Sequence, residues 1–450
     1  MIFLTNASVV TGTDIRKGTV RLDGDRIAGI WYEGDETEPE GLDDPRAKVI
    51  PLDGMALMAG GIDAHVHFRE PGMTRKADME SESAAALLGG VTAVIDMPNT
   101  LPPTVSRERL QEKEELARGR FHTHYGFHIG ATDDNFEELA AAVSEKTAAG
   151  VKVFLGSSTG NMLVGDDKTL DRIFGMTGTE ILVHSEDEAI IRHNLETAQE
   201  RYGENIPFSA HPDIRSRRAC ILSTARALEK AIRFGTRLHV LHVSTAEEVE
   251  MIRAARIHNP GITAETSANY LWFADTDYER LGGKLKCNPA VKSERDRAAL
   301  RKALADGLID TIGSDHAPHL PEEKAHPYLS CPSGIPSIQQ TLPVLLTVAQ
   351  QEGIPLSVIA RVFSERPAEI FGIRDRGRIA VGCHADLVVV DTRARQTVGK
   401  PAYRCGWTPY EGESLTGTVR MVFLDGVPVV RDGRLLQAVP SGKPLAFNRS

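Results

Sequence analysis

Short apolar segments typical of β-strands alternate with amphipathic segments typical of helices through most of the middle of the chain. The predicted strands cover residues 61–67, 92–97, 123–129, 151–154, 181–184, 238–243, 262–265 and 309–314. The clearest amphipathic segments between them cover residues 78–88, 214–234 and 294–306. Consecutive strand–helix units of this kind predict an α/β fold, a (β/α)₈ barrel of the TIM type. The rival is an open doubly wound sheet, but no Gly-x-Gly-x-x-Gly follows the first strand, which removes its commonest nucleotide-binding version.

Both ends of the chain contain short apolar runs separated by turn signals instead. A hairpin is the natural interpretation around Asp23-Gly24-Asp25, and the apolar run at residues 385–391 has the same strand-like character. A chain of 450 residues is long enough for one large domain and a smaller module. We therefore predict a β module composed of residues 1–53 and 377–450, which encloses a barrel formed by residues 54–376.

Composition excludes several classes of protein. The net charge of −10 argues against a general surface for nucleic acid or anionic membranes, although a local basic pocket remains compatible with it. No apolar run approaches the roughly 18 residues of a membrane span, and the first residues do not resemble a secretory signal. We expect a cytoplasmic protein whose five scattered cysteines are reduced thiols.

Histidines and one aspartate stand at the ends of several predicted strands. His65 and His67 lie two residues apart, so their side chains share one face of a strand. His184 and His242 close two further apolar strand segments and Asp315 follows a third, at the strand ends where the active sites of barrel enzymes lie. Any one of these residues is equally compatible with a hydrogen-bonded core or loop position. Together they predict a site for zinc, manganese or cobalt, which imidazole and carboxylate groups bind.

Lys152 is unusual because it lies inside an apolar strand segment. In the simplest interpretation its aliphatic stem packs in the core while the ammonium group reaches solvent. The alternative is carboxylation of the amine by carbon dioxide. The resulting carbamate has two oxygens and can bridge two metal ions.

Four further polar residues follow predicted strands and are candidates for binding a small acid. Arg69 stands two residues after His67, and a guanidinium group binds a carboxylate through two hydrogen bonds. Asn99, Asn288 and His319 are the other three. Asn99 and Asn288 are each adjacent to or near a proline, so turn formation is the alternative role for both.

The strings HVHFREPG and MPNT resemble the amidohydrolase superfamily and, within it, the bacterial class I dihydroorotases. The resemblance continues through GVKVFLGSSTGNMLV, LVHSEDE, RLHVLHVST, KCNPAVK and GSDHAPH to GRIAVGCHADLVVVD near the C-terminus. It implies a reversible hydrolysis of the cyclic amide of dihydroorotate to N-carbamoyl-aspartate, a step of pyrimidine synthesis. It also implies two divalent ions, zinc being the expected metal, and a homodimer.

The same resemblance assigns roles to individual positions. His65 and His67 match ligands of one ion, and His184 and His242 match ligands of the other. Lys152 matches a position where many relatives have a carboxylated, bridging lysine and some have aspartate. Asp315 matches both a metal ligand and the catalytic acid/base. The implied substrate contacts are Arg69, Asn99, Asn288, His319 and the backbone of Gly334.

One departure and three alternatives stay open. Asn269-Tyr270 stands where these relatives usually have paired histidines, which puts a secondary metal or supporting role there in doubt. Hydantoinase and allantoinase share the implied fold and ligands, and Arg69 is the residue that best discriminates against them. The third alternative is a catalytically silent scaffold protein, although all six ligand positions are present in this chain.

Overall fold

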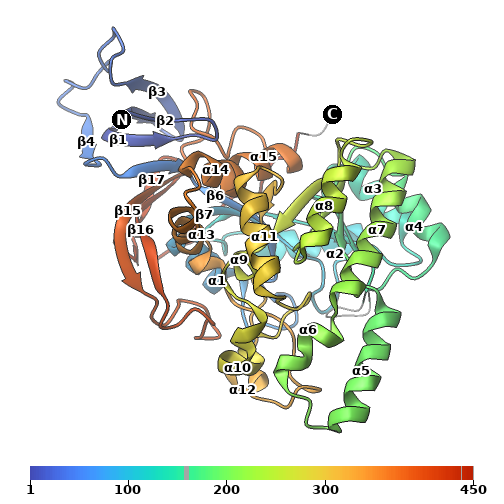
Figure 1. Cartoon of the computed structure of the whole chain (residues 1–450). Helices are drawn as coiled ribbons and strands as arrows, with labels where there is room; N and C mark the ends of the chain where they lie inside the picture. Colours follow the sequence, from blue (N-terminus) through green and yellow to red (C-terminus); the bar gives the residue numbers. More distant parts are fainter. Residues whose placement is uncertain (157–161, 437, 449–450) are drawn as a thin grey trace.

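The computed structural model describes residues 1–156, 162–436 and 438–448. Figure 1 shows a barrel surrounded by helices, with a β-sheet module on one side that contains strands from both ends of the chain. The fold is a TIM-type barrel with a smaller β module, as the sequence predicts.

The barrel strands run parallel and follow one another in chain order. One sheet has the order β6-β7-β8, and another has the order β14-β13-β12-β11-β10-β9. A parallel bridge between Val66 and His316 joins the first strand to the segment after the last, which closes the ring. The strands are β6 (Gly61–Val66), β7 (Val91–Asp96), β8 (His124–Phe127), β9 (Ile129–Gly130), β10 (Val151–Phe154), β11 (Ile181–His184), β12 (Leu238–Val240), β13 (Thr263–Thr266) and β14 (Thr311–Ile312).

Three predicted strands are interrupted or shorter than expected, and the other five agree with the observed strands to within one residue at each end. The third is divided into β8 and β9 at His128. The predicted strand at 238–243 ends after Val240, and the one at 309–314 contains only Thr311–Ile312. His242 and Asp315, which follow these short strands, have left-handed backbone angles φ of 37° and 47°. Such angles are uncommon for residues other than glycine, and here they turn two site side chains out of the strand direction.

Side-chain caps mark the starts of many of the outer helices. Asp78, Ser106, Thr245 and Ser293 each accept a hydrogen bond from a backbone N–H in the first turn of the helix that follows. The helical segments between β6 and β13 are α1 (Met79–Leu88), α2 (Arg107–Ala117), α3 (Phe136–Ser144), α4 (Asp167–Phe174), α5 (Glu188–Tyr202), η1 (Phe208–Ala210), α6 (His211–Ile214), α7 (Arg217–Phe234) and α8 (Ala246–Ala255).

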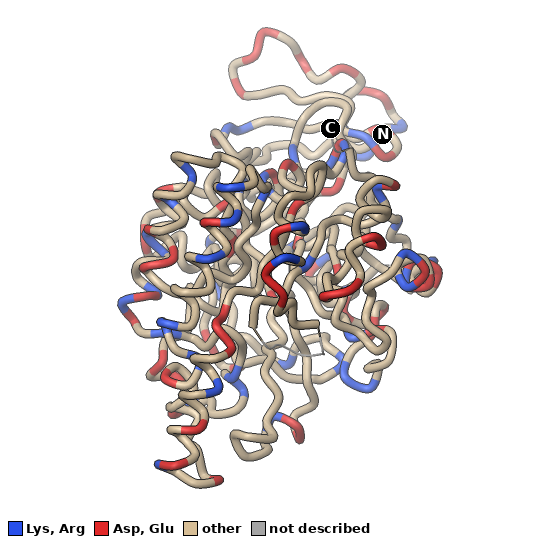
Figure 2. The backbone as a smooth tube through the Cα atoms, turned by 90° about the vertical axis from the view of Figure 1, so that its right-hand side faces the viewer, with Lys and Arg blue, Asp and Glu red and all other residues tan. Residues whose placement is uncertain are grey.

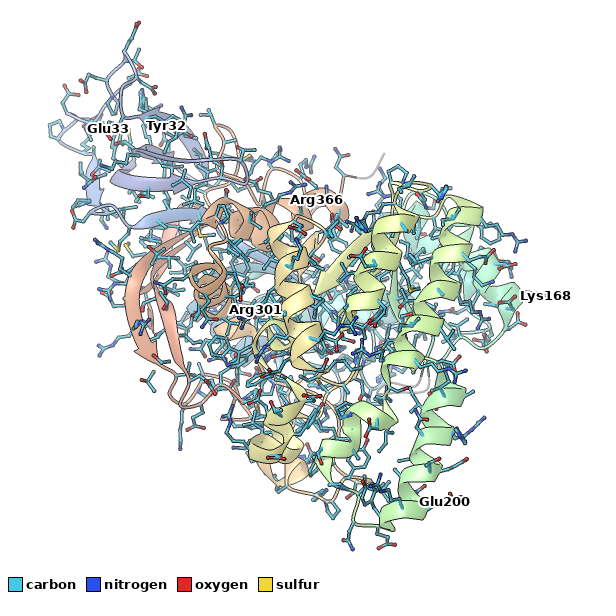
Figure 3. All side chains as sticks on the ribbon, viewed as in Figure 1. Tyr32, Glu33, Lys168, Glu200, Arg301 and Arg366 are labelled. Carbon is cyan, nitrogen blue, oxygen red and sulfur yellow. The ribbon has the colours of Figure 1, made fainter. Side chains whose placement is uncertain are left out.

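The remaining helical segments lie between β13 and the C-terminal strands. They are α9 (Ala268–Trp272), η2 (Asp275–Asp277), α10 (Tyr278–Leu281), η3 (Gly282–Leu285), α11 (Glu294–Ala305), α12 (Pro321–Lys324), α13 (Ile338–Glu352), α14 (Leu356–Ala360), η4 (Arg361–Glu365) and α15 (Arg366–Phe371). Figure 3 shows Arg301 on α11, and Glu200 near the far end of α5.

Strand β5 (Ala56–Ala59) joins the two ends of the chain into one sheet. It pairs in parallel with β1 (Ile2–Val10) and antiparallel with β15 (Leu387–Thr397). The other strands of this nine-stranded sheet are β2 (Ile15–Asp23), β3 (Arg26–Tyr32), β4 (Lys48–Pro51), β16 (Ser414–Leu424), β17 (Val427–Arg431) and β18 (Arg434–Leu435). β5 lies just beyond the boundary at residue 53, and that boundary stays a prediction.

The surface carries charges of both signs. Figure 2 shows Lys and Arg interspersed with Asp and Glu along the outer segments. All five cysteines are free thiols in this structure. Within the described ranges, no helix is both long and apolar enough to cross a membrane.

Candidate metal centre and substrate pocket

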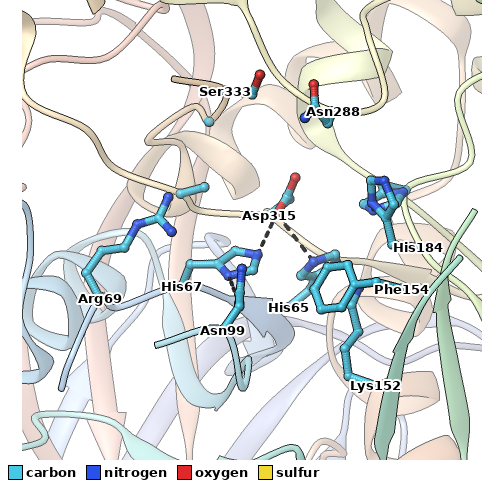
Figure 4. Close-up of a pocket in the computed structure, with 13 residues that line it drawn as sticks. His65, His67, Arg69, Asn99, Lys152, Phe154, His184, Asn288, Asp315 and Ser333 are labelled. Carbon is cyan, nitrogen blue, oxygen red and sulfur yellow. Dashed lines mark hydrogen bonds and ion pairs between the residues drawn. The ribbon is translucent and has the colours of Figure 1, made fainter. Parts of the chain in front are cut away.

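A cavity opens where the barrel strands end, and most of the predicted site residues line it (Figure 4). Side chains from both halves of the barrel meet there: His67 and Asp315, for example, lie 248 positions apart in the sequence. The lining residues are His65, His67, Arg69, Asn99, Lys152, Phe154, His184, His242, Asn288, Asp315, Ala317, Ser333 and Gly334.

His65, His67 and Asp315 form the first group of potential metal ligands. Oδ1 of Asp315 lies 3.0 Å from Nε2 of His67 and 3.3 Å from Nε2 of His65 (Figure 4). Burial alone would raise the pKa of the Asp315 carboxyl, but the nitrogen groups of His65, His67 and Lys152 around it together hold the pKa below its ordinary value. Asp315 is therefore an anion at neutral pH, as a metal ligand or general base requires.

His184 and His242 form the second group. Nδ1 of His184 lies 3.0 Å from Nε2 of His242. Two nitrogens about 2.0–2.1 Å from one zinc ion come about this close together, so both can reach a single ion. The His242 ring also lies 5.3 Å from the His65 ring, measured between centroids. The two groups of ligands are therefore neighbours in one cavity.

Oxygen atoms behind three of the histidines determine which ring nitrogen faces the cavity. Nδ1 of His65 lies 2.6 Å from Oε1 of Glu265, and Nδ1 of His67 lies 2.8 Å from Oδ1 of Asn99. Nε2 of His184 lies 3.0 Å from Oε2 of Glu186. Because each oxygen accepts a ring N–H, the opposite nitrogen keeps a lone pair for a metal ion.

Burial keeps these imidazoles neutral. It lowers the pKa of His65, His67, His184 and His242 below the ordinary histidine value. A neutral imidazole is the form that binds a metal ion.

The sequence prediction did not include Glu265 and Glu186. Glu265 ends the predicted seventh strand, and Glu186 stands two residues after His184. The position of Glu186 two residues after a strand-end histidine could have identified it, whereas His65, the partner of Glu265, lies 200 positions away in the chain.

Lys152 lies fully inside the protein, so its ammonium group does not reach solvent. The side chain is 1% exposed, and Nζ lies 4.7 Å from the centre of the Phe154 ring. Burial lowers the pKa of Lys152 to about 7, so a large fraction of the amine is neutral at physiological pH. Only the neutral amine reacts with carbon dioxide, and the environment of Lys152 is therefore compatible with the predicted carboxylation.

The donor atoms fit two divalent ions. They are buried imidazole nitrogens and a carboxylate oxygen, the ligand types that zinc binds. His65, His67 and Asp315 have ligand atoms within 4.8 Å of one another. Bound ions would compensate for this concentration of inward-facing lone pairs.

Arg69 lies at the opposite side of the cavity from His184 (Figure 4). Its Nε donates to the carbonyl of Pro318 at 3.1 Å, and Nη2 lies 3.1 Å from Nε2 of His319. Burial lowers the pKa of the Arg69 guanidinium to about 10, so the group stays charged at neutral pH. Arg69 therefore places a buried positive charge at the cavity wall.

Three other predicted substrate contacts, Asn99, Asn288 and Gly334, line the cavity. Asn288 lines the cavity with an Oδ1 atom that is buried and has no hydrogen-bond partner among the described residues. Gly334 also lines it, with a φ of 150°, and a Cβ there would lie 2.4 Å from the carbonyl oxygen of Ala317. Only glycine fits that position without a shift of the backbone. Asn99 lines the cavity and also supports His67.

His319 lies behind Arg69 and is not among the residues that line the cavity. Nζ of Lys76 lies 3.0 Å from Nδ1 of His319, and Nε2 lies 3.0 Å from the carbonyl oxygen of Ser333. If Lys76 donates to Nδ1, the ring proton resides on Nε2 and points to Ser333. In that tautomer His319 bonds the carbonyl of Ser333 at the cavity wall and contacts Arg69 without accepting a hydrogen bond from it.

Asn269 and Tyr270 support the backbone around the site. Oδ1 of Asn269 accepts from the Tyr410 hydroxyl at 2.8 Å, and its amide donates to the carbonyl of Ser314 at 3.4 Å. The Tyr270 hydroxyl donates to the carbonyl of Pro289 at 2.7 Å. Neither residue lines the cavity. The departure noted in the sequence therefore involves residues beneath Asp315 and Asn288.

Comparison with known proteins identifies the class. The model of the amidohydrolase family matches residues 56–429, and the chain belongs to this family. It is 33% identical over 424 residues to a dihydroorotase of Methanosarcina acetivorans, covering 91% of this chain and 88% of that protein. It is 32% identical to an allantoinase of Deinococcus radiodurans, covering 99% and 98%.

A solved structure, the L-hydantoinase (dihydropyrimidinase) from Arthrobacter aurescens, matches with a TM-score of 0.92 and 27% identity over 99% of both chains. The chain is therefore a metal-dependent cyclic amidohydrolase by family. The similar dihydroorotases of Methanosarcina acetivorans and Halobacterium salinarum are archaeal, so the bacterial class I subtype stays a prediction.

Replacement of the Glu265 carboxylate tests its support of His65. In Glu265→Gln the shape is kept but the negative charge behind His65 is lost, and we expect the affinity for a divalent ion to fall roughly 10–100-fold. Elemental analysis after dialysis against graded chelator concentrations measures this. Glu248→Gln is the control, because Glu248 is also buried but bonds Thr224 and Thr245 outside the cavity. Unchanged ion retention in Glu265→Gln would contradict the assignment.

Proposed function

We propose that the protein is a dihydroorotase, which reversibly hydrolyses the cyclic amide of (S)-dihydroorotate to N-carbamoyl-L-aspartate. The observation that carries the proposal is the buried Arg69 guanidinium at the wall of the candidate metal cavity. A ring that bears a carboxylate requires a cation at this place, whereas hydantoin and allantoin bear no carboxylate. The dihydroorotases among the similar proteins support the same reaction.

The hydrogen bonds of Arg69 leave donors for a substrate. A guanidinium group has five N–H donors, and Nε is used by the carbonyl of Pro318. When the His319 proton points to Ser333, Nε2 of His319 no longer accepts from Arg69, and both terminal nitrogens of Arg69 are available. They match the two oxygens of a carboxylate in a planar, bidentate geometry. Asn99 and Asn288 supply amide groups for the polar edge of the ring.

In the proposed mechanism, Asp315 moves the proton. Divalent ions held by His65, His67, Lys152, His184, His242 and Asp315 would lower the pKa of a water toward about 7 and polarise the carbonyl. The Asp315 carboxylate accepts the proton as the water oxygen adds to the ring carbonyl carbon. When the C–N bond of the amide breaks, Asp315 returns that proton to the leaving nitrogen. Arg69 meanwhile holds the substrate carboxylate and thereby orients the carbonyl.

The alternatives are separate outcomes of one experiment. An allantoinase and a hydantoinase match nearly the full chain, so either activity is the second candidate. We expect turnover of dihydroorotate to exceed that of hydantoin and allantoin when all three are assayed side by side on enzyme of measured metal content. Faster turnover of an uncharged ring would replace the proposal. Absence of both metal and turnover would instead support the silent scaffold.

The cofactor and cellular assignments belong to the same proposal. Zinc is the expected metal, and Lys152 is the expected site of N6-carboxylation. The substrate is a small molecule rather than a nucleic acid. A cytoplasmic location is expected from the sequence pattern, and a homodimer from the resemblance to dihydroorotases.

Arg69→Met removes the positive charge but keeps much of the side-chain volume. Loss of a charged hydrogen-bonded pair of about 1.5–3 kcal/mol predicts a KM for dihydroorotate roughly 10–100-fold higher. Arg75→Met is the matched control, because Arg75 lies on the same loop with a side chain that is 69% exposed. Steady-state kinetics of the three enzymes give the result. Equal KM values for wild type and Arg69→Met would refute the carboxylate clamp.

Asp315→Asn removes the proton acceptor while preserving the size of the side chain. We expect this variant to fold and to retain metal, but to lose at least about 100-fold in kcat, since general acid–base catalysis contributes about 10²–10⁴-fold. Circular dichroism and elemental analysis establish folding and metal content before the assay. A kcat within a factor of about three of the wild type would sink the assignment of Asp315 as acid/base.

A further inference from the structure

A second buried cation, Lys324, lies outside the set of residues that line the cavity. Lys324 is the last residue of the short helix α12, and its side chain turns inward so that the residue is only 3% exposed. Burial lowers the pKa of Lys324 to about 7. A lysine so placed requires compensation by hydrogen bonds, because burial of its charged form is unfavourable.

Three backbone carbonyl groups supply that compensation. Nζ of Lys324 donates to the carbonyl oxygens of Lys286 at 2.9 Å, Pro332 at 2.9 Å and Gly334 at 3.0 Å. An ammonium group has three N–H donors, so these bonds use all of them. Because all three bonds go to the same nitrogen atom, they fix the positions of the three carbonyl groups relative to one another.

Two of those carbonyls belong to segments that form the substrate pocket. Gly334 lines the cavity itself, and Lys286 stands two residues before the cavity-lining Asn288. The backbone N–H of Gly334 also donates to the carbonyl of Lys286 at 2.9 Å. Lys324 therefore joins the Gly334 loop to the Asn288 segment, although the two lie 46 positions apart in the chain.

The loop and segment that Lys324 joins are also in contact with the Arg69 side of the cavity, through His319. His319 lies 3.0 Å from the carbonyl oxygen of Ser333, the residue before Gly334, and 3.1 Å from Arg69. Because the Gly334 loop is also bonded to the Asn288 segment, a displacement of this loop would alter the distance between Arg69 and Asn288. That distance determines whether both can contact one small ring.

We propose that Lys324 is a positioning residue for substrate binding, which holds Gly334 and Asn288 at the separation that the substrate ring requires. Lys324 acts through these two residues and does not touch the substrate. The inference rests on the proposed function in one respect, since it assumes that the ring lies between Arg69, Asn288 and Gly334.

The test is a double-mutant cycle of Lys324→Met and Asn288→Ala on the metal-loaded enzyme. We expect Lys324→Met to raise the KM for dihydroorotate by at least about tenfold, with a smaller change in kcat and unchanged metal content. In the Asn288→Ala background the same substitution should change KM by a clearly smaller factor, because the contact that it positions is already absent. Lys302→Met is the control, since Lys302 lies on the surface of α11 with a side chain that is 74% exposed.

A purely structural role gives a different pattern. Lys324→Met would then lower the melting temperature but leave KM unchanged, or its effect on KM would multiply independently with that of Asn288→Ala. Either result overturns the proposal. If Lys324→Met does not fold, Lys324→Gln, which keeps two N–H donors on a shorter side chain, is assayed in the same cycle with the same criteria.

Failure of this inference is distinguishable from failure of the proposed function. The proposed function is judged on the wild-type enzyme, by which of three rings it hydrolyses fastest. The role of Lys324 is judged by the ratio of variant to wild-type KM on whichever ring the wild type accepts. An enzyme that prefers hydantoin would refute the dihydroorotase assignment and leave the Lys324 test intact.

Discussion

The closure of the barrel is the constraint on which the rest of the site depends. The N–H of His67 donates to the carbonyl of His316 at 2.9 Å, next to the bridge between Val66 and His316. This backbone contact joins the first strand to the segment after the last, and it brings His67 and Asp315 within 3.0 Å of each other. Without this contact, the distance between His67 on the first strand and Asp315 after the last strand would not be fixed. Parallel strands then direct the remaining ligands to the same end of the barrel.

A second constraint is the burial of many polar groups within one cavity. Each buried histidine would be unfavourable as a cation, and burial accordingly lowers the pKa of His65, His184 and His242. Glu265 and Glu186 accept ring N–H groups from behind, which leaves the opposite nitrogen of His65 toward Asp315 and that of His184 toward His242. The arrangement is unfavourable without bound cations, and this is the physical reason to expect that metal ions belong to the native state.

The sequence predicted much of the site because its residues obey a local rule. His65 and His67 share a strand face, and His184 directly ends a strand, so their direction follows from the two-residue period of a β-strand. His242 and Asp315 required more, since both have left-handed backbone angles that no pattern of residues indicates. Glu265 and Lys324 were missed because their roles depend on groups distant in the chain: His65 for one, and the carbonyls of Lys286 and Gly334 for the other. His319 was expected at the cavity and lies behind Arg69.

The sequence by itself determined the alternation of strands and helices, the kinds of ligand atoms, and the presence of an arginine beside the metal-binding pattern. These properties follow from hydrophobic periodicity and from the chemistry of single side chains, which do not depend on distant contacts. Tertiary structure alone decided which nitrogen of each histidine faces the cavity, that Lys152 is cut off from solvent, and that Arg69 and His184 lie on opposite sides of Asp315. These outcomes depend on the packing of segments hundreds of residues apart, and only the closed barrel brings those segments together.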